Sequence, residues 1–550
     1  MYKKYGYLII TLILSVFLIS CDVNKKEVVK KDQKRDAVIV QETGGYIVNA
    51  ITRDAITLNP VLINDSTSQQ VSDMIYEGLV KYDKDLKLIG VLAETWETLD
   101  QGLEVIFHLK KNVKWHDGEL FTAYDVKFTY DTIMKFKNYN SDGGDMSQLY
   151  TLFEYVDDVN ILDDYTIKVS YKVPFARTIE IWSIGIIPRH IFGQYDDLKD
   201  FIRSDYNRKP VGTGKYRLNK WLPDERIILE VNRNYHGKVP YIDKLIFSIN
   251  PEQTIIYLDT MLGKIDISSL TPTQFTRLLD DEEKLKKLMA VHYTGGHYMY
   301  LGYNMKVKKL SDQRVRKALT LAINRQEIID GVLEGLGQIC YGPFLPYSWA
   351  FNKDIKPLPY DVAKAAKLMH EAGWRDSDDD GILDKDGKPF ELEVVVDRSE
   401  PNRNMALKFI KRNLKDIGVR MIINPVSWTT LVQNHMYAKN FDAVMVGWQL
   451  NKDPDVYNIW HTDGALNFYS YSNKEVDRLL EKGRKTFDRA IRKECYNRIH
   501  SLIMDDMPYT FLYIDDILVS INRRIKGVKV SESGLNSISD WYVKYRTVMY

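Results

Sequence analysis

The side chains with the clearest capacity for chemistry lie in an acidic loop that runs from residue 376 to residue 387. Its carboxylates stand at loop positions 1, 3, 5 and 9 and belong to Asp376, Asp378, Asp380 and Asp384. An EF-hand loop has this spacing, because Ca²⁺ prefers oxygen ligands. Position 12 is Gly387 instead of the bidentate glutamate that supplies the strongest ligand. We therefore expect a solvated turn between a helix and a strand, with weak calcium binding by these four aspartates as the alternative.

Spacings typical of catalytic centres are missing from the 550 residues. There is no G-x-S-x-G elbow, no H-E-x-x-H, no P-loop and no G-x-G-x-x-G after a strand. The closest pair of histidines, His292 and His297, is five residues apart, which does not place both rings on one helical face. We expect neither an enzyme nor a bound cofactor; a triad assembled from distant serine, histidine and aspartate residues is the alternative.

The composition is that of a folded protein that does not bind nucleic acid. Apolar residues make up 45% and charged residues 27% of the chain, which is close to the average for soluble domains. Lys and Arg number 76 against 75 Asp and Glu, so the basic excess of a nucleic-acid-binding protein is missing. Aromatic residues reach 12%, and such rigid amphipathic rings suit both a core and the walls of a ligand cleft.

Three cysteines in a chain of this length do not make a disulfide framework. Cys340 and Cys495 are expected to be free buried thiols, because free cysteine is among the most buried residue types. A disulfide between them is the alternative. Cys21 has a different expected role.

Residues 1–20 are expected to be a signal peptide. Two lysines precede an apolar run over residues 7–19, and this order is typical of a secretory signal. The run is shorter than the about 20 apolar residues that span a bilayer. The run Leu18-Ile19-Ser20-Cys21 resembles a bacterial lipobox, which implies a lipid on Cys21 after cleavage. An ordinary cleaved signal or an uncleaved anchor is the alternative.

The segment after Cys21 is expected to be a flexible tether. Residues 22–36 contain six Lys or Arg, four Asp or Glu and three apolar side chains, too few to form a core. Residues 21–36 would therefore connect the lipid to a globular body. This organisation predicts an extracytoplasmic protein that is lipid-anchored to a bacterial membrane.

A strand, a turn and the start of a helix are predicted one after another early in the globular body. Apolar and polar residues alternate over residues 103–109, the period of a half-buried strand. The run Trp115-His116-Asp117-Gly118 predicts a turn, because Asp-Gly tolerates positive φ at low cost. Thr122 is expected to cap the next helix, with Asp125 at its third position.

Helices with an apolar face are predicted further along the chain. Apolar residues keep a 3.6-residue spacing between Ser311 and Gly337, with Asp312 as the expected start and Gly335 or Gly337 as the end. The same pattern predicts a helix over residues 361–373.

A third helix is predicted from about residue 402 to residue 417, where Gly418 would end it. Strands at residues 392–396 and 422–423 flank this helix. Because helices alternate with strands, we expect an α/β fold in layers.

Four segments carry a pattern that goes beyond secondary structure. They are Met74–Val80 with Leu92–Trp96, Phe107–Leu109, Val113–Gly118 and Thr122–Val126; Val211–Tyr216; Asn304 with Asp312, Val315–Leu319 and Ala322–Arg325; and Phe441–Ala443 with Gly447-Trp448 and Asp453–Asp455. Together they resemble the family 5 extracellular solute-binding proteins that serve peptide and nickel ABC importers. Lys215 stands where this family commonly has proline. Trp115, Asp117 and Gly118 are expected to determine the fold and not to bind ligand.

The resemblance implies a two-lobed clamp of the periplasmic-binding-protein type with an extra third domain. The implied parts are lobe I over residues 37–77, 206–297 and 517–550, lobe II over residues 78–205, and lobe III over residues 298–516. The two chain crossings between lobes I and III, near Tyr298–Tyr303 and Tyr513–Asp516, would form a hinge that closes around ligand.

The resemblance also indicates how a peptide would be held. Peptide-binding members have an aspartate three positions after the tryptophan of the Gly-Trp pair, and it binds the α-ammonium group of the peptide. Counting from Trp448, that position is Asn451, which carries no charge. Asp453 lies two residues further on and is the expected substitute. A neutral residue here weakens the case for peptides with free N-termini without affecting ligand capture itself.

Further ligand contacts are expected from loops that line the cleft in relatives. These residues are Asn64, Asp65, Ser66, Tyr303, Asn304, Asn467 and Tyr469, with Trp448 as a wall of the cleft. The implied function is capture of extracytoplasmic oligopeptides by a monomeric substrate-binding lipoprotein, which delivers them to an ABC permease. The alternatives are the same role for a nickel chelate or another non-peptide solute, or a surface adhesin or sensor on the same fold.

Overall fold

The computed structural model of the chain describes residues 43–83, 86–139, 148–531 and 534–543, all within one unit formed by residues 42–550. The predicted signal peptide, the lipidated Cys21 and the tether therefore lie outside the described residues. Among the residues that are described, no helix is both long enough and apolar enough to cross a membrane.

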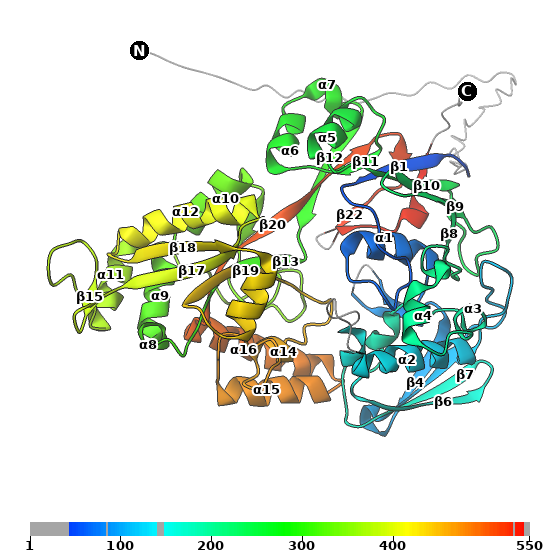
Figure 1. Ribbon diagram of the computed structural model, residues 1–550, viewed down its shortest axis with the longest axis horizontal. Coiled ribbons are helices and arrows are strands. Elements are labelled where there is room, and N and C mark those ends of the chain that lie inside the picture. The colour runs from blue at the N-terminus through cyan, green and yellow to red at the C-terminus, as the bar shows by residue number, and fades with distance from the viewer. Residues whose placement is uncertain (1–42, 84–85, 140–147, 532–533, 544–550) are drawn as a thin grey trace, which may run out of the picture. The chain divides into compact units, whose positions relative to one another are not determined.

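The largest sheet in the described part of the chain has twelve strands (Figure 1). Its order is β18–β17–β19–β13–β20–β11–β1–β10–β9–β8, and β12 and β14 also pair with β20. The strands are β1 (Tyr46–Ile51), β8 (Tyr216–Leu222), β9 (Arg226–Val231), β10 (Lys244–Ile249), β11 (Ile267–Ser269), β12 (Leu288–Thr294), β13 (His297–Tyr303), β14 (Gly337–Ile339), β17 (Glu391–Asp397), β18 (Arg420–Val426), β19 (Ala443–Gln449) and β20 (Tyr509–Asn522).

The long strand β20 joins two groups of strands. Residues 509–515 pair with β13 and β14, whereas residues 516–522 pair with β12 and β11. The chain crosses between the same groups a second time at Gly295, whose N–H donates to the carbonyl of Asp515 at 3.0 Å. A Cβ atom on Gly295 would lie 2.5 Å from that carbonyl oxygen, so only glycine allows the two crossings to lie this close.

A separate sheet is built from β4 (Ala93–Leu99), β5 (Glu104–Leu109), β7 (Thr166–Tyr171) and β6 (Val156–Asp163), in that order. Strand β5 confirms the strand predicted from alternation. Helix α2 (Ala123–Lys135) begins after Thr122, whose N–H donates to the Asp125 carboxylate at 2.9 Å, as predicted. The turn before it is also confirmed: Gly118 has φ +101°, and the Trp115 side chain is buried.

One predicted helix is wrong. The segment between Ser311 and Gly337 forms α9 (Gln313–Ala322) and α10 (Arg325–Leu333), with a break between them. The break arises because the Asn324 side chain accepts from the N–H of Glu327 and starts a new helix. Glu334 and Gly335 end α10 with positive φ, and Gly337 begins β14.

The next two predicted helices are confirmed. Helix α11 (Val362–Glu371) is capped by Asp361 and followed by Gly373 with φ +87°; α12 (Pro401–Lys415) is followed by Gly418 with φ +74°. Strands β17 and β18 flank α12, also as predicted. The α/β fold is thus confirmed.

The remaining helices and strands complete the fold. The helices are α1 (Ser66–Ile75), α3 (Arg189–Phe192), α4 (Leu198–Arg203), α5 (Gln253–Met261), α6 (Pro272–Leu279), α7 (Glu282–Leu285), α8 (Lys308–Ser311), α13 (Trp428–Thr430), α14 (Tyr457–Trp460), α15 (Lys474–Lys485) and α16 (Arg489–Asp506). The short strands are β2 (Val80–Tyr82), β3 (Leu88–Gly90), β15 (Asp384–Lys385), β16 (Lys388–Pro389), β21 (Ile525–Lys526), β22 (Val530–Ser531), β23 (Gly534–Leu535) and β24 (Tyr542–Val543).

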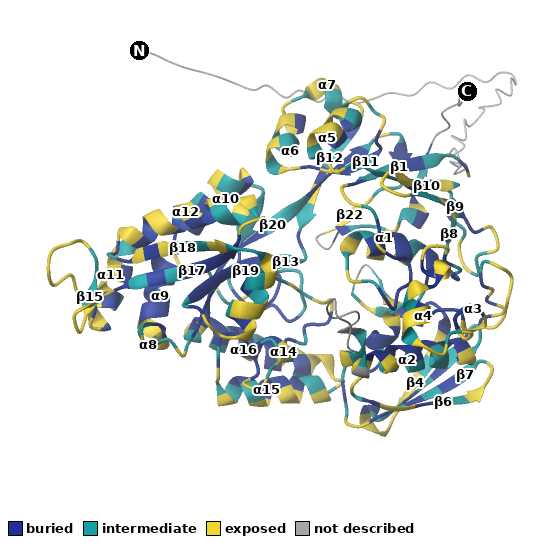
Figure 2. Cartoon of the chain, in the orientation of Figure 1, coloured by how far each residue is buried: buried dark blue, intermediate teal, exposed yellow. Residues whose placement is uncertain are grey.

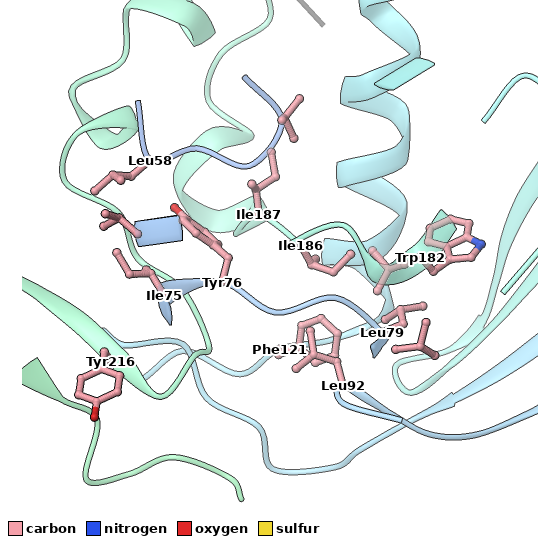
Figure 3. Packing of buried hydrophobic residues seen from close by; sticks show 14 of the residues in the cluster. Leu58, Ile75, Tyr76, Leu79, Leu92, Phe121, Trp182, Ile186, Ile187 and Tyr216 are labelled. Carbon is pink, nitrogen blue, oxygen red and sulfur yellow. The ribbon is translucent and has the colours of Figure 1, made fainter. Parts of the chain in front are cut away.

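Buried apolar residues fall into separate cores (Figure 2). One cluster combines residues up to Val291 with residues from Val519 onward, and Figure 3 shows Tyr76, Phe121, Trp182 and Tyr216 within it. Two other clusters consist of residues between 298 and 514. Each group of strands therefore has its own core.

Cys340 and Cys495 are free and buried, which confirms the prediction for these thiols. Burial raises the pKa of Cys340 to about 12, so this thiol is unreactive at neutral pH.

Candidate ligand-binding site

A cavity of about 820 Å³ is lined mainly by the group of strands that contains β1, β10 and β11. Its walls are one face of β1, β10, β11 and β20, the end of α1 with the segment up to Tyr82, and residues 535–541. Asn451 and Lys452, from the loop after β19, line it as well. This is the size of sites that hold small molecules or short chains. We name this cavity the cleft.

Glu77 is the acidic group in the cleft with the most complete set of hydrogen bonds. Its carboxylate accepts from the Tyr235 hydroxyl at 2.6 Å and from the Thr213 hydroxyl at 3.3 Å, and lies 2.8 Å from His236 Nε2. These partners occupy both oxygens. Glu77 therefore fixes the wall and offers little to a ligand.

Asp73 and Lys452 bring opposite charges to the cleft from distant parts of the chain. The Asp73 carboxylate accepts from Gln69 Nε2 at 2.5 Å. Partial loss of hydration raises the pKa of Asp73, whereas the hydrogen bond from Gln69 and the positive charge of Lys452 lower it. Lys452 Nζ lies 5.6 Å from the centre of the Tyr82 ring. The loop after β19 thus presents an amide and a cation to the cleft.

Asp453 is not among the residues that line the cleft. Its two carboxylate oxygens accept from Arg492 Nη1 and Nη2 at 2.8 and 2.7 Å, and one of them also accepts from the N–H of Asp455. Both charged side chains are 8% exposed. Because Arg492 pairs with both oxygens of this carboxylate, the charge of Asp453 is already matched within the protein.

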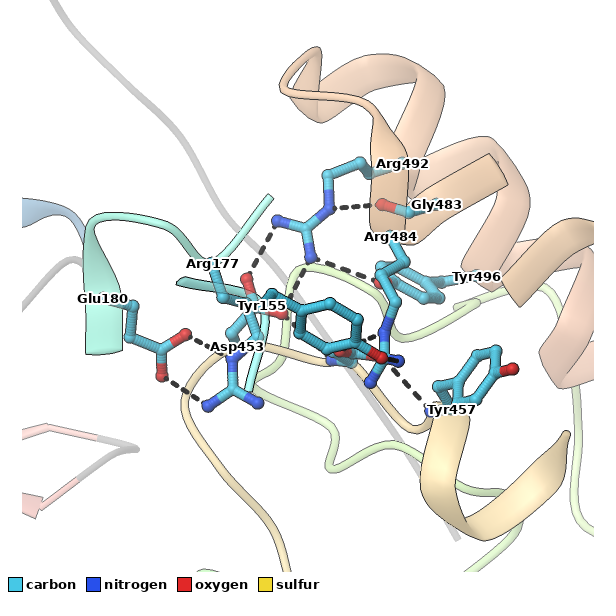
Figure 4. A network of polar contacts seen from close by, with 10 residues as sticks. Tyr155, Arg177, Glu180, Asp453, Tyr457, Gly483, Arg484, Arg492 and Tyr496 are labelled. Carbon is cyan, nitrogen blue, oxygen red and sulfur yellow. Dashed lines mark hydrogen bonds and ion pairs between the residues drawn. The ribbon is translucent and has the colours of Figure 1, made fainter. Parts of the chain in front are cut away.

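A network of polar contacts surrounds this pair and connects two distant segments (Figure 4). Arg484 donates to the Asp455 carboxylate at 3.0 Å and to the Tyr155 hydroxyl at 2.9 Å. Arg177 pairs with Glu180 at 2.8 Å, and Glu180 lines the cleft. Tyr155 thereby links the β6 side of the molecule to α15.

Three predicted contacts lie at the start of α1 and outside the lining of the cleft. The Asp65 carboxylate accepts from the N–H of Ser68 at 2.8 Å and caps the helix, of which Ser66 is the first residue. Asn64 lines a different cavity, of about 660 Å³.

Four further predicted contacts are buried in the core of residues 298–514. The Tyr303 hydroxyl bonds to Thr510 at 2.6 Å and the Tyr469 hydroxyl to Tyr300 at 2.8 Å. The amides of Asn304 and Asn467 donate to backbone carbonyls, and those bonds hold the loops around them.

Trp448 is half-buried and stacks against Tyr300 and Phe468, with interplanar angles of 14° and 11°. Trp448 lies in β19 and packs against the core, whereas Asn451, in the loop after β19, lines the cleft.

Several residues of the cleft were not predicted. Glu77 and Lys215 lie within two of the segments that resemble the family, so those segments could have indicated both residues. Asp73, Lys452 and Ser539 belong to no local pattern, because the fold brings them together from three distant parts of the chain.

The acidic loop has part of the arrangement that calcium binding would need. Carboxylate oxygens of Asp376, Asp378 and Asp384 lie within 4.8 Å of one another, and all three side chains are at least partly exposed. Asp384 accepts from the N–H and hydroxyl of Ser377, which lowers its pKa. Asp380 lies 3.4 Å from Arg420, which competes for its charge.

The profile of one family, described as "Bacterial extracellular solute-binding proteins, family 5 Middle", matches residues 87–469. The chain belongs to this family. It is 31% identical over 543 residues to the oligopeptide-binding protein AppA of Bacillus subtilis, covering 97% of both chains. It is 27% identical to the dipeptide-binding protein of Escherichia coli, covering 86% of this chain and 90% of that one.

Solved structures of family members have the same fold. The structure of AppA from Bacillus subtilis in complex with a nonapeptide superposes with a TM-score of 0.75 at 31% identity, covering 92% of this chain and all of that one. NikZ from Campylobacter jejuni in complex with Ni(L-His) gives a TM-score of 0.73 at 26% identity, covering 90% and 99%.

Proposed function

We propose that this family 5 protein captures oligopeptides outside the cytoplasm and delivers them to an ABC permease. The observation that carries the proposal is the similarity to the oligopeptide-binding protein AppA over 97% of both chains. The cleft supports it, because 820 Å³ accommodates a short peptide and charges of both signs line its walls.

Ligand capture would proceed by closure of a hinge. We propose lobe I as residues 37–77, 206–297 and 517–550, lobe II as 78–205 and lobe III as 298–516. The two crossings, at Gly295 and near Asp515, are adjacent and bonded to each other, so a small rotation there moves one core relative to another. A ligand that contacts both walls of the cleft would stabilise the closed state.

Membrane attachment is a further part of the proposal. A lipid on Cys21 and the charged tether of residues 21–36 would hold a monomer near its permease without fixing its orientation. Replacement of Cys21 by serine would release the protein from membranes if the lipid is its anchor.

A nickel chelate is the second candidate ligand. It is supported by the similarity to NikZ and by the absence of a free acid in the loop 451–455 among the described residues, because a chelate needs no partner for an α-ammonium group.

Native mass spectrometry of the full chain, extracted in detergent, tests these proposals. Masses above that of the lipidated chain that vanish on unfolding and sequence as peptides would establish peptide capture. Release of nickel with a small organic ligand would favour the second candidate. A mass without bound solute, together with no thermal stabilisation by peptide pools, would contradict capture and favour an adhesin or sensor.

A further inference from the structure

Lys215 occupies an unusually well-fixed position in the wall of the cleft. The backbone before it is held by Gly214, whose N–H donates to the Ile75 carbonyl at 2.8 Å, and Lys215 itself accepts from the N–H of Asn232 at 2.8 Å. The ammonium group donates to the Ser539 hydroxyl at 2.6 Å. Proline, common in the family at this position, could supply no charge.

The ammonium group of Lys215 has capacity left for a ligand. A lysine ammonium has three N–H donors, and among the described residues the structure gives it one acceptor, Ser539. Ser539 is itself buried and lies 3.0 Å from the Ser537 hydroxyl. Both serines line the cleft beside Lys215.

A second cation lies close by. Lys81, in β2, lines the same cleft and is exposed, and it forms no ion pair with any described residue. Burial and the nearby charge of Lys81 lower the pKa of Lys215, whereas the charges of Glu77 and Asp540 act in the other direction. Two adjacent ammonium groups repel each other unless an anion lies between them.

The carboxylates near these lysines are already paired. Glu77 accepts from Tyr235 and Thr213 and lies 2.8 Å from His236. Asp540 lies 3.1 Å from Lys238. Among the described residues, neither Glu77 nor Asp540 forms an ion pair with Lys81 or Lys215, so N–H donors of both lysines are left for a ligand.

We infer that Lys81 and Lys215 form a carboxylate-binding subsite in the cleft, which holds either the C-terminal carboxylate or an acidic side chain of the bound peptide. This inference rests on the proposed peptide-binding function and adds a determinant of specificity to it. Charge-assisted hydrogen bonds of this kind are about twice as strong as neutral ones.

The test uses the full chain in detergent and a mixture of synthetic peptides of two to nine alanines. Each length is present as the free acid and as the C-terminal amide. Two further amides of each length carry one internal glutamate or one internal glutamine. Bound peptides are released by unfolding and counted by mass spectrometry. The free acid, the glutamate peptide or both should be retained about tenfold or more over the matching neutral peptide.

Variants assign the effect to the two lysines. Lys215→Gln should bring the ratio close to one, and Lys81→Gln should lower it several-fold, whereas Lys220→Gln, an exposed lysine on the same strand as Tyr216, should leave it unchanged. Thermal unfolding of each variant checks that it is folded.

Two outcomes would overturn the inference in distinguishable ways. If acidic and neutral peptides are retained in equal amounts, the subsite is rejected while peptide capture stays intact. The same holds if the preference for acidic peptides survives in the double variant Lys81→Gln, Lys215→Gln. Retention of no peptide rejects the proposed function and the subsite with it.

Discussion

Asp453 and Arg492 form a buried bidentate ion pair, with oxygen-to-nitrogen distances of 2.7 and 2.8 Å. Asp453 belongs to the same loop as Asn451 and Lys452, which line the cleft. The pair explains why an acid two residues from the expected position is not available to an α-ammonium group. In this chain the aspartate holds the loop, and the loop offers an amide and a cation.

Removal of Asp453 should therefore destabilise the fold. In Asp453→Ala, the Arg492 guanidinium stays buried without its partner, and we expect the free energy of unfolding to fall by about 3 kcal/mol or more. Denaturant titration of the full chain measures this. Asp463→Ala, at an exposed aspartate in the neighbouring loop, should change it by less than about 0.5 kcal/mol. A cost below about 1 kcal/mol for Asp453→Ala would contradict the pairing.

The same ion pair predicts that Asp453 does not contribute to binding of the α-ammonium group of a peptide. Asp453→Asn should leave the ratio of bound free-amine to N-acetylated peptides unchanged, because Arg492 already pairs with both oxygens of the carboxylate. Competition between matched peptides, read by mass spectrometry, gives this ratio. A drop towards one would assign the amine to Asp453 after all.

The bond between Tyr155 and Arg484 should slow ligand release. It joins the proposed lobe II to the proposed lobe III, and Tyr155→Phe removes one hydroxyl while keeping the ring. We expect peptide to dissociate about three- to tenfold faster, because the closed state loses one charge-assisted hydrogen bond. Stopped-flow fluorescence measures the rate. Tyr206→Phe, at an exposed tyrosine, is the matched control, and an equal rate in both variants would argue against a role in closure.

Local signals predicted the elements whose ends are set by their own residues. The Thr122–Asp125 cap and the turn at Gly118 depend on neighbours within three or four positions, and both are present. The break at Asn324 was missed because the apolar spacing continues through it, while one side-chain bond decides the boundary.

The cleft was harder to predict because its parts are distant in the chain. Lys215 and Ser539 are 324 positions apart, and no periodicity relates them. The predicted contacts Asn304 and Asn467 are polar residues in a recognised neighbourhood, yet their amides satisfy backbone carbonyls in the core. A sequence pattern gives residue types near a site, whereas packing decides which side chains reach it.

His500 should make stability depend on pH. Burial lowers its pKa to about 4, although the Tyr341 carbonyl, 2.8 Å from Nε2, acts in the other direction. Nδ1 accepts from the N–H of Asn352, so the ring is neutral in this arrangement. The folded pKa lies below the usual 6.5. The neutral ring thus contributes stability that is complete above about pH 6.5 and is lost as the pH falls through about 4, about 3 kcal/mol in all.

Denaturant titrations between pH 7 and pH 4 check this dependence. His500→Gln should flatten the slope of unfolding free energy over this range, and His370→Gln, at an exposed histidine, should not. An unchanged slope in His500→Gln would show that the ring is charged in the folded state.

Gly212 should tolerate no side chain. A Cβ atom there would lie 1.9 Å from the carbonyl oxygen of Ile75, at the end of α1, and backbone atoms cannot move aside as a flexible side chain can. We expect Gly212→Ala to cost about 3 kcal/mol or more of unfolding free energy, since overpacking against backbone exceeds ordinary core strain. Gly263→Ala, with φ +76° but open space around it, should cost about 1 to 2 kcal/mol.

The consequence of Gly212→Ala for binding follows from its place in the chain. Gly212 and Gly214 hold the backbone that positions Lys215, so a shift of residues 212–214 would also move the Lys215 ammonium group in the cleft. A folded fraction of Gly212→Ala should therefore retain acid and amide peptides more equally than the wild-type chain, whereas Gly263→Ala keeps the wild-type ratio. Equal ratios in all three proteins would show that Gly212 supports the fold without positioning the Lys215 ammonium group.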